Sequence, residues 1–314
     1  MPTASSQPYT TDDLPTALHL LVAYRAADPA QLTRYPTVWR LWLLLSSRLG
    51  QPKHDARLWL DEQDTPVAFT ALWSRHPADS YRALEWVIAP DADPALGDAI
   101  FTWAMARVEQ LTQKLGAPLR LAAGACPGED ARIALIERHR LTRQADGNVY
   151  MTCPLANLPA SALLPESYTI CQLTGEADVA EVAAYQTLYE QVFAPVALAH
   201  RLELLRSPNY LHLAARAPEG QMVAFCELSY SRAEWAAYPA RCVSWVDYVG
   251  TAEAQQRKGL GRALLLVGLQ RLHALGSDTA LLITMEANAG AQSVYTALGF
   301  TILEHDVSYS RELG

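Results

Sequence analysis

The sequence predicts an α/β (α+β) chain of two similar domains, each a mixed, mostly antiparallel sheet flanked by helices. Two observations predict this fold. A β-branched and aromatic run, Val243–Val249, leads through a loop with two glycines into an apolar helix that ends before Gly276. Short motifs of the first half of the chain also recur in the second half, after about 160 residues.

The composition is that of a globular protein. With 314 residues the chain is long enough for two domains, and 50% of its residues are hydrophobic and 18% charged. The formal net charge of −8 argues against nucleic acid or an anionic membrane as the main partner. Met1–Asp13 lacks the apolar centre of a signal peptide, and Val38–Leu49 is too short and too polar to span a bilayer. We therefore expect a helix at 38–49, no membrane association and a cytoplasmic location.

Cysteines and histidines give no metal signature. The five cysteines are scattered and form no CxxC pair, so neither a disulfide framework nor a zinc site is predicted. The eight histidines lack ligand spacing, and His200, His212 and His305 are interpreted as isolated surface or satisfied residues. We expect no metal.

The loop between Val249 and Arg262 has the features of an anion-binding turn. Gly259 and Gly261 let the backbone approach a ligand closely, and the N–H groups of the first helical turn point toward it. A dinucleotide fingerprint would need a small residue at Leu264, and a P-loop would need Gly-Lys-Ser/Thr, so both are excluded. What remains is Gln256-x-x-Gly259-x-Gly261 with basic neighbours. Taken alone, this pattern fits an ordinary loop with two turn glycines equally well.

A second motif follows a short apolar run, Ala280–Met285. Asn288–Phe300 has the pattern Asn-x-x-Ala-x-x-x-Tyr-x-x-x-Gly-Phe, in which Asn288 suits the N-cap of a helix and Gly299 its C-terminal cap. In this order, and separated by a helix and a strand, the two motifs resemble those of the GNAT superfamily of N-acetyltransferases. The resemblance covers about the last 150 residues directly.

The internal repeat extends the resemblance to the first half, so that the chain resembles a tandem GNAT protein. The matching motifs are Val67–Phe69 with Val223–Phe225, Trp86-Val87 with Trp245-Val246, Gly97 with Gly259, Leu115-Gly116 with Leu275-Gly276, and Tyr150 with Tyr309. We predict a degenerate GNAT-like domain at 1–153, a proline-containing linker at 154–165, and an acetyl-CoA-binding GNAT domain at 166–314.

The first copy has lost most of the loop motif. Pro94 stands where the second copy has Gln256, and only Gly97-x-Ala99 remains of the two glycines. The acidic Asp91-Ala92-Asp93 before the loop would repel a pyrophosphate. We therefore expect the first domain to be structural or to shape the substrate site, and we expect one active site, in the second domain.

The resemblance implies acetyl-CoA as acyl donor and direct attack of an amine on the thioester. The family's general acid is the tyrosine of the second motif, here Tyr295, which would protonate the departing thiolate; the alternative is a tyrosine that only packs on the sheet. A main-chain N–H near Val249 would stabilise the oxyanion, and Asn288 would contact pantetheine or only cap its helix. The expected cofactor-binding residues are Val249, Gly250, Thr251, Gln256, Arg257, Lys258, Gly259, Leu260, Gly261, Arg262 and Asn288.

Two carboxylates are candidates for the general base. In the family, residues two and four before the point where the strand parts from its neighbour reach the acceptor amine, and here these are Asp247 and Trp245. A carboxylate within an apolar strand is costly unless paired, so Asp247 is the first candidate; its structural alternatives are an ion pair with Arg241 and a β-bulge position. Glu227, on the neighbouring strand, is the second candidate. Either could orient a cationic amine rather than take its proton.

The identity of the acceptor does not follow from the sequence. Tyr185, Tyr189, Phe193 and the 235–238 loop fit a pocket floor or, with more weight, a core stripe. We expect a small-molecule amine as acceptor and a monomer or homodimer. Acetylation of a peptide or protein amine, and a non-catalytic acyl-CoA-binding or regulatory protein, stay open as alternatives.

Overall fold

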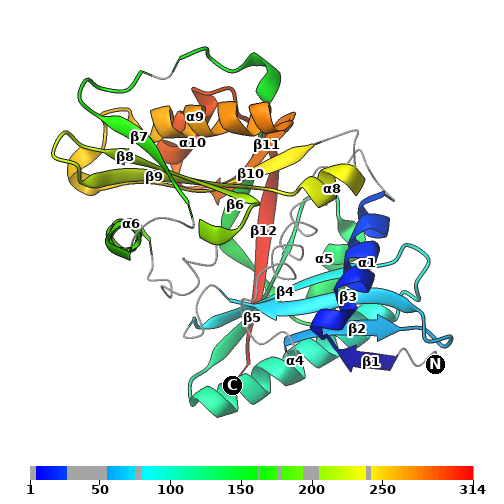
Figure 1. Ribbon diagram of the computed structural model, residues 1–314. Coiled ribbons are helices and arrows are strands. Elements are labelled where there is room, and N and C mark those ends of the chain that lie inside the picture. The colour runs from blue at the N-terminus through cyan, green and yellow to red at the C-terminus, as the bar shows by residue number, and fades with distance from the viewer. Residues whose placement is uncertain are drawn as a thin grey trace. The chain divides into compact units, whose positions relative to one another are not determined.

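The computed structural model describes residues 5–26, 55–74, 79–161, 163–174, 179–193, 205–237 and 242–313 (Figure 1). They form two compact units, residues 1–147 with 306–314 and residues 148–305. The predicted helix at 38–49 and the predicted partner Arg241 lie outside the described residues. None of the helices in the described segments combines the length and apolar character needed to cross a bilayer.

The first unit is a sheet with helices on both faces. Its strands follow the order β1, β2, β3, β4, β5, β12, and their recorded pairings are antiparallel except for β4 with β5. Helix α1 packs on one face, and α4 packs on the other. The elements are β1 (Ser5–Pro8), α1 (Leu14–Ala26), β2 (Ala56–Leu60), β3 (Pro66–Trp73), β4 (Tyr81–Ile88), α4 (Leu96–Leu115), β5 (Leu119–Ala125) and α5 (Asp130–Arg138).

The second unit repeats this plan. Its strands follow the order β6, β11, β10, β9, β8, β7, and β10 with β11 is the parallel pair. Helices α9 and α10 lie on one face of the sheet, and α6 lies on the other (Figure 1). The elements are β6 (Thr142–Pro154), β7 (Thr169–Leu173), α6 (Val179–Val192), β8 (Tyr210–Arg216), β9 (Met222–Tyr230), α8 (Arg232–Ala237), β10 (Val243–Thr251), α9 (Leu260–Leu275), β11 (Thr279–Met285), α10 (Ala289–Thr296) and β12 (Thr301–Leu313).

The predicted fold class is therefore confirmed: both units have mixed, mostly antiparallel sheets flanked by helices. The order β3, β4, α4, β5 of the first unit recurs as β9, β10, α9, β11 in the second. Helices α4 and α9 also end alike, at the left-handed glycines Gly116 (φ 66°) and Gly276 (φ 106°).

Strands β6 and β12 each begin in one unit and end in the other. Asn148–Pro154 of β6 pair with β11 in the second unit, and Val307–Leu313 of β12 pair with β5 in the first. Val307–Leu313 thus pair with a strand that comes early in the chain. A strand's own pattern shows which face is buried but not which distant strand it joins. The domain boundaries drawn from the repeat stay predictions.

Candidate active site

The centre of the second sheet opens between its two parallel strands. The first pair of residues between β10 and β11 is Val243 with Thr279, and the last is Val246 with Leu282. Strand β10 itself continues to Thr251. Beyond Leu282, β11 remains paired with β6. The main-chain groups on this side of the last residues of β10 are therefore available to a ligand.

The loop after β10 presents backbone N–H groups at the start of α9. Gly259 is the N-cap residue at φ 80°, and Arg257 also has a positive φ of 62°. The first hydrogen bond into the helix is Ala263 N–H to Gly259 C=O at 3.0 Å, so the N–H groups of Leu260, Gly261 and Arg262 have no partner in the helix. Such a helix start binds an anion through its N–H groups and its dipole.

The other predicted cofactor-binding residues divide into exposed and anchored groups. Arg257, Lys258 and Arg262 are exposed around the helix start, whereas the Leu260 side chain is buried and fixes the helix on the sheet. Lys258 Nζ lies 2.6 Å from Gln255 Oε1 and 3.3 Å from the Tyr168 hydroxyl. Val249, Gly250 and Thr251 lie at the end of β10. Gln256 lies in the loop, and its side-chain amide donates to the Thr251 carbonyl at 3.3 Å. Asn288 is the N-cap of α10 and accepts from Ala291 N–H at 3.1 Å.

Gly259 provides a direct test of this anion site. Gly259→Ala is expected to lower stability by about 1 kcal/mol, because a residue with a Cβ is strained at φ 80°. It should also weaken acetyl-CoA binding roughly tenfold in calorimetric titration, because the methyl group enters the space over the N–H groups. Gly220→Ala is the matched control: Gly220 has φ 87° in the β8–β9 turn, so the variant should lose similar stability and no affinity. Equal affinity losses in both variants would contradict the assignment.

The matching helix start in the first unit is closed by its own residues. The Asp93 carboxylate accepts from Ala95 N–H at 2.8 Å, and the Asp93 carbonyl accepts from Leu96 N–H at 3.0 Å. Asp98 N–H donates to the Ala95 carbonyl at 3.1 Å, and Ala95 itself is right-handed (φ −66°) rather than a left-handed glycine. A negative charge therefore already occupies the place of a ligand anion.

The gap between the parallel strands of the first unit is also filled. The pairing of β4 with β5 is recorded from Tyr81 to Ala83 only. The Arg132 guanidinium lies 3.5 Å from the centre of the Trp86 ring, and its Nε donates to the Gly124 carbonyl of β5 at 2.8 Å. Its Nη2 lies 4.0 Å from Oε2 of the buried Glu85.

We therefore expect each chain to bind a single acetyl-CoA. Titration calorimetry should give a stoichiometry of one, because Asp93 and Arg132 take the places of a ligand in the first unit. Under the same conditions Gly259→Ala should show no second, unaffected binding event. A stoichiometry of two, or a tight site that survives in this variant, would show that the first unit binds the cofactor.

Tyr295 lies on α10 and packs against the core cluster on the α9 face. That cluster includes Cys226 and Val246, and Val249 packs against it as well. No described residue hydrogen-bonds to the phenol hydroxyl. Burial and, second, the neighbouring Cys226 raise the pKa of Tyr295 to about 12. The phenol therefore keeps its proton at neutral pH, as a general acid must.

Asp247 is the extra residue of a β-bulge. The register of β10 with β9 passes from Val246 opposite Leu228 to Tyr248 opposite Glu227 and leaves Asp247 between them. Asp247 is partly buried as a residue, and its Oδ2 is fully buried and has no hydrogen-bond partner among the described residues. Burial raises the pKa of Asp247 well above its ordinary value; the Ser229 hydroxyl lowers it and the Glu227 charge raises it. The β-bulge expected as a structural alternative is thus present at Asp247, and the same residue has a carboxyl group with a raised pKa.

Glu227 is fully buried beside His212, which the sequence indicated only as an isolated surface or satisfied residue. His212 is 1% exposed and lies opposite Glu227 in the β8–β9 register. The turn at Gly220 fixes that register, so the pairing could have been inferred from the hairpin. Tyr185 and Tyr189 are buried in a core cluster with Phe225, as expected of a core stripe. Among the described residues, no group of three or more His, Cys, Asp or Glu side chains is placed to hold a metal.

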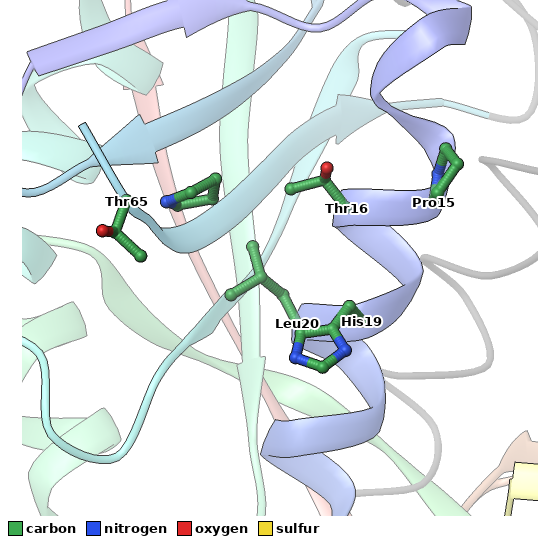
Figure 2. A pocket seen from close by; sticks show the side chains of 6 residues that line it. Pro15, Thr16, His19, Leu20 and Thr65 are labelled. Carbon is green, nitrogen blue, oxygen red and sulfur yellow. The ribbon is translucent and has the colours of Figure 1, made fainter.

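A hollow in the first unit does not contribute to this site. Figure 2 shows it between α1 and the beginning of β3. His19 is the titratable side chain in its wall, which otherwise consists of Pro15, Thr16, Leu20, Thr65 and Pro66. The hollow therefore offers neither an acid and base pair nor an anion site.

The comparison with known families agrees with this geometry. Residues 178–300 match the model of the acetyltransferase (GNAT) family. The matched segment includes β10, the loop, α9 and α10. These residues form a GNAT domain. Mycothiol acetyltransferases are similar to part of the chain: that of Streptomyces scabiei is 32% identical over 157 residues, 49% of each chain. That of Amycolatopsis mediterranei is 48% identical over 69 residues, 22% of this chain and 23% of the relative. The chain thus matches about half or less of these relatives' length.

Solved structures share the fold of the whole chain. A tandem GNAT protein from the clavulanic acid biosynthesis pathway aligns with a TM-score of 0.73 and 15% identity over 99% of both chains. A GCN5-related N-acetyltransferase from Sphaerobacter thermophilus aligns with a TM-score of 0.70 and 16% identity over 99% of this chain and 96% of that one. The chain therefore has the fold of these two structures, and the residues that match the GNAT family model lie in its second half.

Proposed function

We propose that the protein transfers an acetyl group from acetyl-CoA to a primary amine of a small molecule. The observation that carries the proposal is the open helix start at Gly259 at the end of a strand that has parted from its neighbour, with a protonated Tyr295 on the same face of the sheet. The free N–H groups and the exposed Arg257, Lys258 and Arg262 fit a pyrophosphate. The names of the curated relatives support an acceptor of small-molecule size.

The residues divide the chemistry as follows. Bound acetyl-CoA supplies an electrophilic thioester carbonyl. Asp247 takes a proton from the acceptor ammonium, so that the amine nitrogen can form the new C–N bond as the C–S bond breaks. Tyr295 donates its proton to the departing sulfur, and a main-chain N–H near Val249 stabilises the negative charge on the carbonyl oxygen. The second proton of the attacking nitrogen then passes to the Tyr295 phenolate, and the proton on Asp247 leaves to solvent, so that one amide and one thiol are formed.

Thiol release from acetyl-CoA across a panel of small primary amines tests the proposal. We expect turnover with at least one amine and none with buffer alone. Peptides with free N-termini and lysines belong in the same panel, because their selective acetylation would replace the small-molecule acceptor. Tight binding of acetyl-CoA without turnover on any amine would favour a non-catalytic acyl-CoA-binding protein and contradict the enzyme.

A further inference from the structure

Glu227 is a buried carboxylate that the proposed reaction does not use directly. It lies within β9, and its side chain is 1% exposed. Its Oε1 accepts a hydrogen bond from the Tyr185 hydroxyl at 2.8 Å and lies 3.9 Å from Nδ1 of His212. A carboxylate in such surroundings is costly unless its partners are held in place. Glu227 is therefore a buried carboxylate held by specific contacts and not a surface charge.

The partners of Glu227 are themselves fixed by packing. The His212 ring stacks on Tyr210, with ring centres 5.7 Å apart and planes 17° apart. It meets the Tyr185 ring edge-on at 6.2 Å. Tyr185 is fully buried and also packs edge-on against Phe225. Three elements, α6, β8 and β9, thus converge on one carboxylate, whose side chain is 1% exposed.

The bulge of β10 brings Asp247 to the same cluster. Tyr248 lies opposite Glu227, so the bulged Asp247 is held beside that carboxylate. Asp247 is partly exposed, whereas Glu227 is not. Two like charges at one site disfavour each other's ionisation, so Glu227 makes Asp247 hold a proton more strongly. The two carboxylates therefore have different roles.

We propose that Glu227, held by Tyr185 and His212, is a positioning residue that acts on the acceptor amine through Asp247. This inference rests on the proposed function. Glu227 is then not the general base itself but a fixed negative charge beside the base, Asp247. The titratable groups around the two carboxylates are Cys226 on β9, Tyr210 and His212 on β8, Tyr248 on β10 and Tyr185 on α6.

Glu227→Gln tests the inference by a readout that does not need turnover. In protein carrying ¹³C-labelled aspartate, the Asp247 carboxyl signal is identified by its loss in Asp247→Asn and followed through a pH titration. In Glu227→Gln we expect this signal to titrate at lower pH than in wild type, because the neighbouring charge is gone. The acidic limb of kcat/KM should move in the same direction. We expect kcat to fall on the order of tenfold, because Asp247 becomes a weaker base, with the KM for acetyl-CoA unchanged.

Tyr185→Phe is the second variant, and it tests the role of Glu227 if Glu227→Gln does not fold. It removes only the hydroxyl that holds the Glu227 carboxylate in place, so the repulsion between Glu227 and Asp247 weakens and Asp247 should again titrate at lower pH. Tyr189→Phe, which removes a hydroxyl one turn along α6, should leave the Asp247 titration at its wild-type position.

The outcomes separate this inference from the proposed function. An Asp247 titration that is the same in wild type, Glu227→Gln and Tyr185→Phe overturns the role of Glu227, even in an active enzyme. A wild-type protein that acetylates no amine overturns the proposed function, and the inference about the acceptor falls with it.

Discussion

Replacing Asp247 with asparagine is expected to lower kcat/KM by about 10²–10⁴-fold and, at the same time, to make the protein more stable at neutral pH. The loss of activity follows from removing the group that takes the proton of the acceptor. The gain in stability follows because Asp247 carries a buried oxygen without a hydrogen-bond partner among the described residues. Functional sites often hold such groups at a cost in stability.

The raised pKa of Asp247 determines whether stability rises or falls with pH. The folded-state pKa of Asp247 is raised above its ordinary value of 3.8, so the folded protein keeps a proton that the unfolded chain releases. Wild-type stability should therefore fall as the pH rises from about 4 through the folded pKa, whereas Asp247→Asn avoids this loss. Thermal unfolding should show a higher Tm for the variant at pH 8 and nearly equal Tm values at pH 4.

Asp91→Asn is the matched control, because it removes the same charge from an exposed position in the first unit. It should change neither Tm nor turnover. A variant Asp247→Asn that is both active and no more stable at pH 8 would make Asp247 an ordinary bulge residue.

Replacing Tyr295 with phenylalanine is expected to lower kcat by about 10²–10⁴-fold without changing the affinity for acetyl-CoA. The phenol packs against the core cluster through its ring, so phenylalanine keeps the packing and removes only the acid. Calorimetry should give the same dissociation constant for wild type and variant. Unchanged turnover in Tyr295→Phe would mean that the tyrosine only packs on the sheet.

The wild-type pH profile offers an independent check on Tyr295. An ordinary phenol loses its proton near pH 10, but the pKa of Tyr295 is raised to about 12. The rate should therefore not fall near pH 10 through deprotonation of Tyr295. A descending limb at that pH that disappears in Tyr295→Phe would contradict the buried environment of the phenol.

Much of the site could be predicted because its parts are local in sequence. Gly259 and Asn288 lie where a helix start needs them, and each is a few residues from its partners. The repeat showed that the first domain had lost the loop. The sequence indicated Asp91-Ala92-Asp93 as repulsive, and the structure adds the mechanism, a carboxylate that caps the helix start.

What could not be predicted depends on contacts between distant segments. Arg132 fills the gap of the first unit, but nothing near it in the chain indicates Trp86 or Glu85 as its neighbours. Tyr185 and His212 surround Glu227 from a helix and a strand that precede it, and an aromatic stripe has the same pattern whether or not one hydroxyl reaches a carboxylate.

The strands that begin in one unit and end in the other affect how the chain folds as it is made. The sheet of the first unit gains Val307–Leu313 opposite β5, about 190 residues further along the chain. A ribosome delivers those residues only after the whole second unit, so the edge of β5 stays unpaired by β12 during most of synthesis. Contacts of such high sequence separation form slowly, and open strand edges invite aggregation. In this chain the first unit cannot complete its sheet before the second unit has been translated, although both units follow the same order of elements.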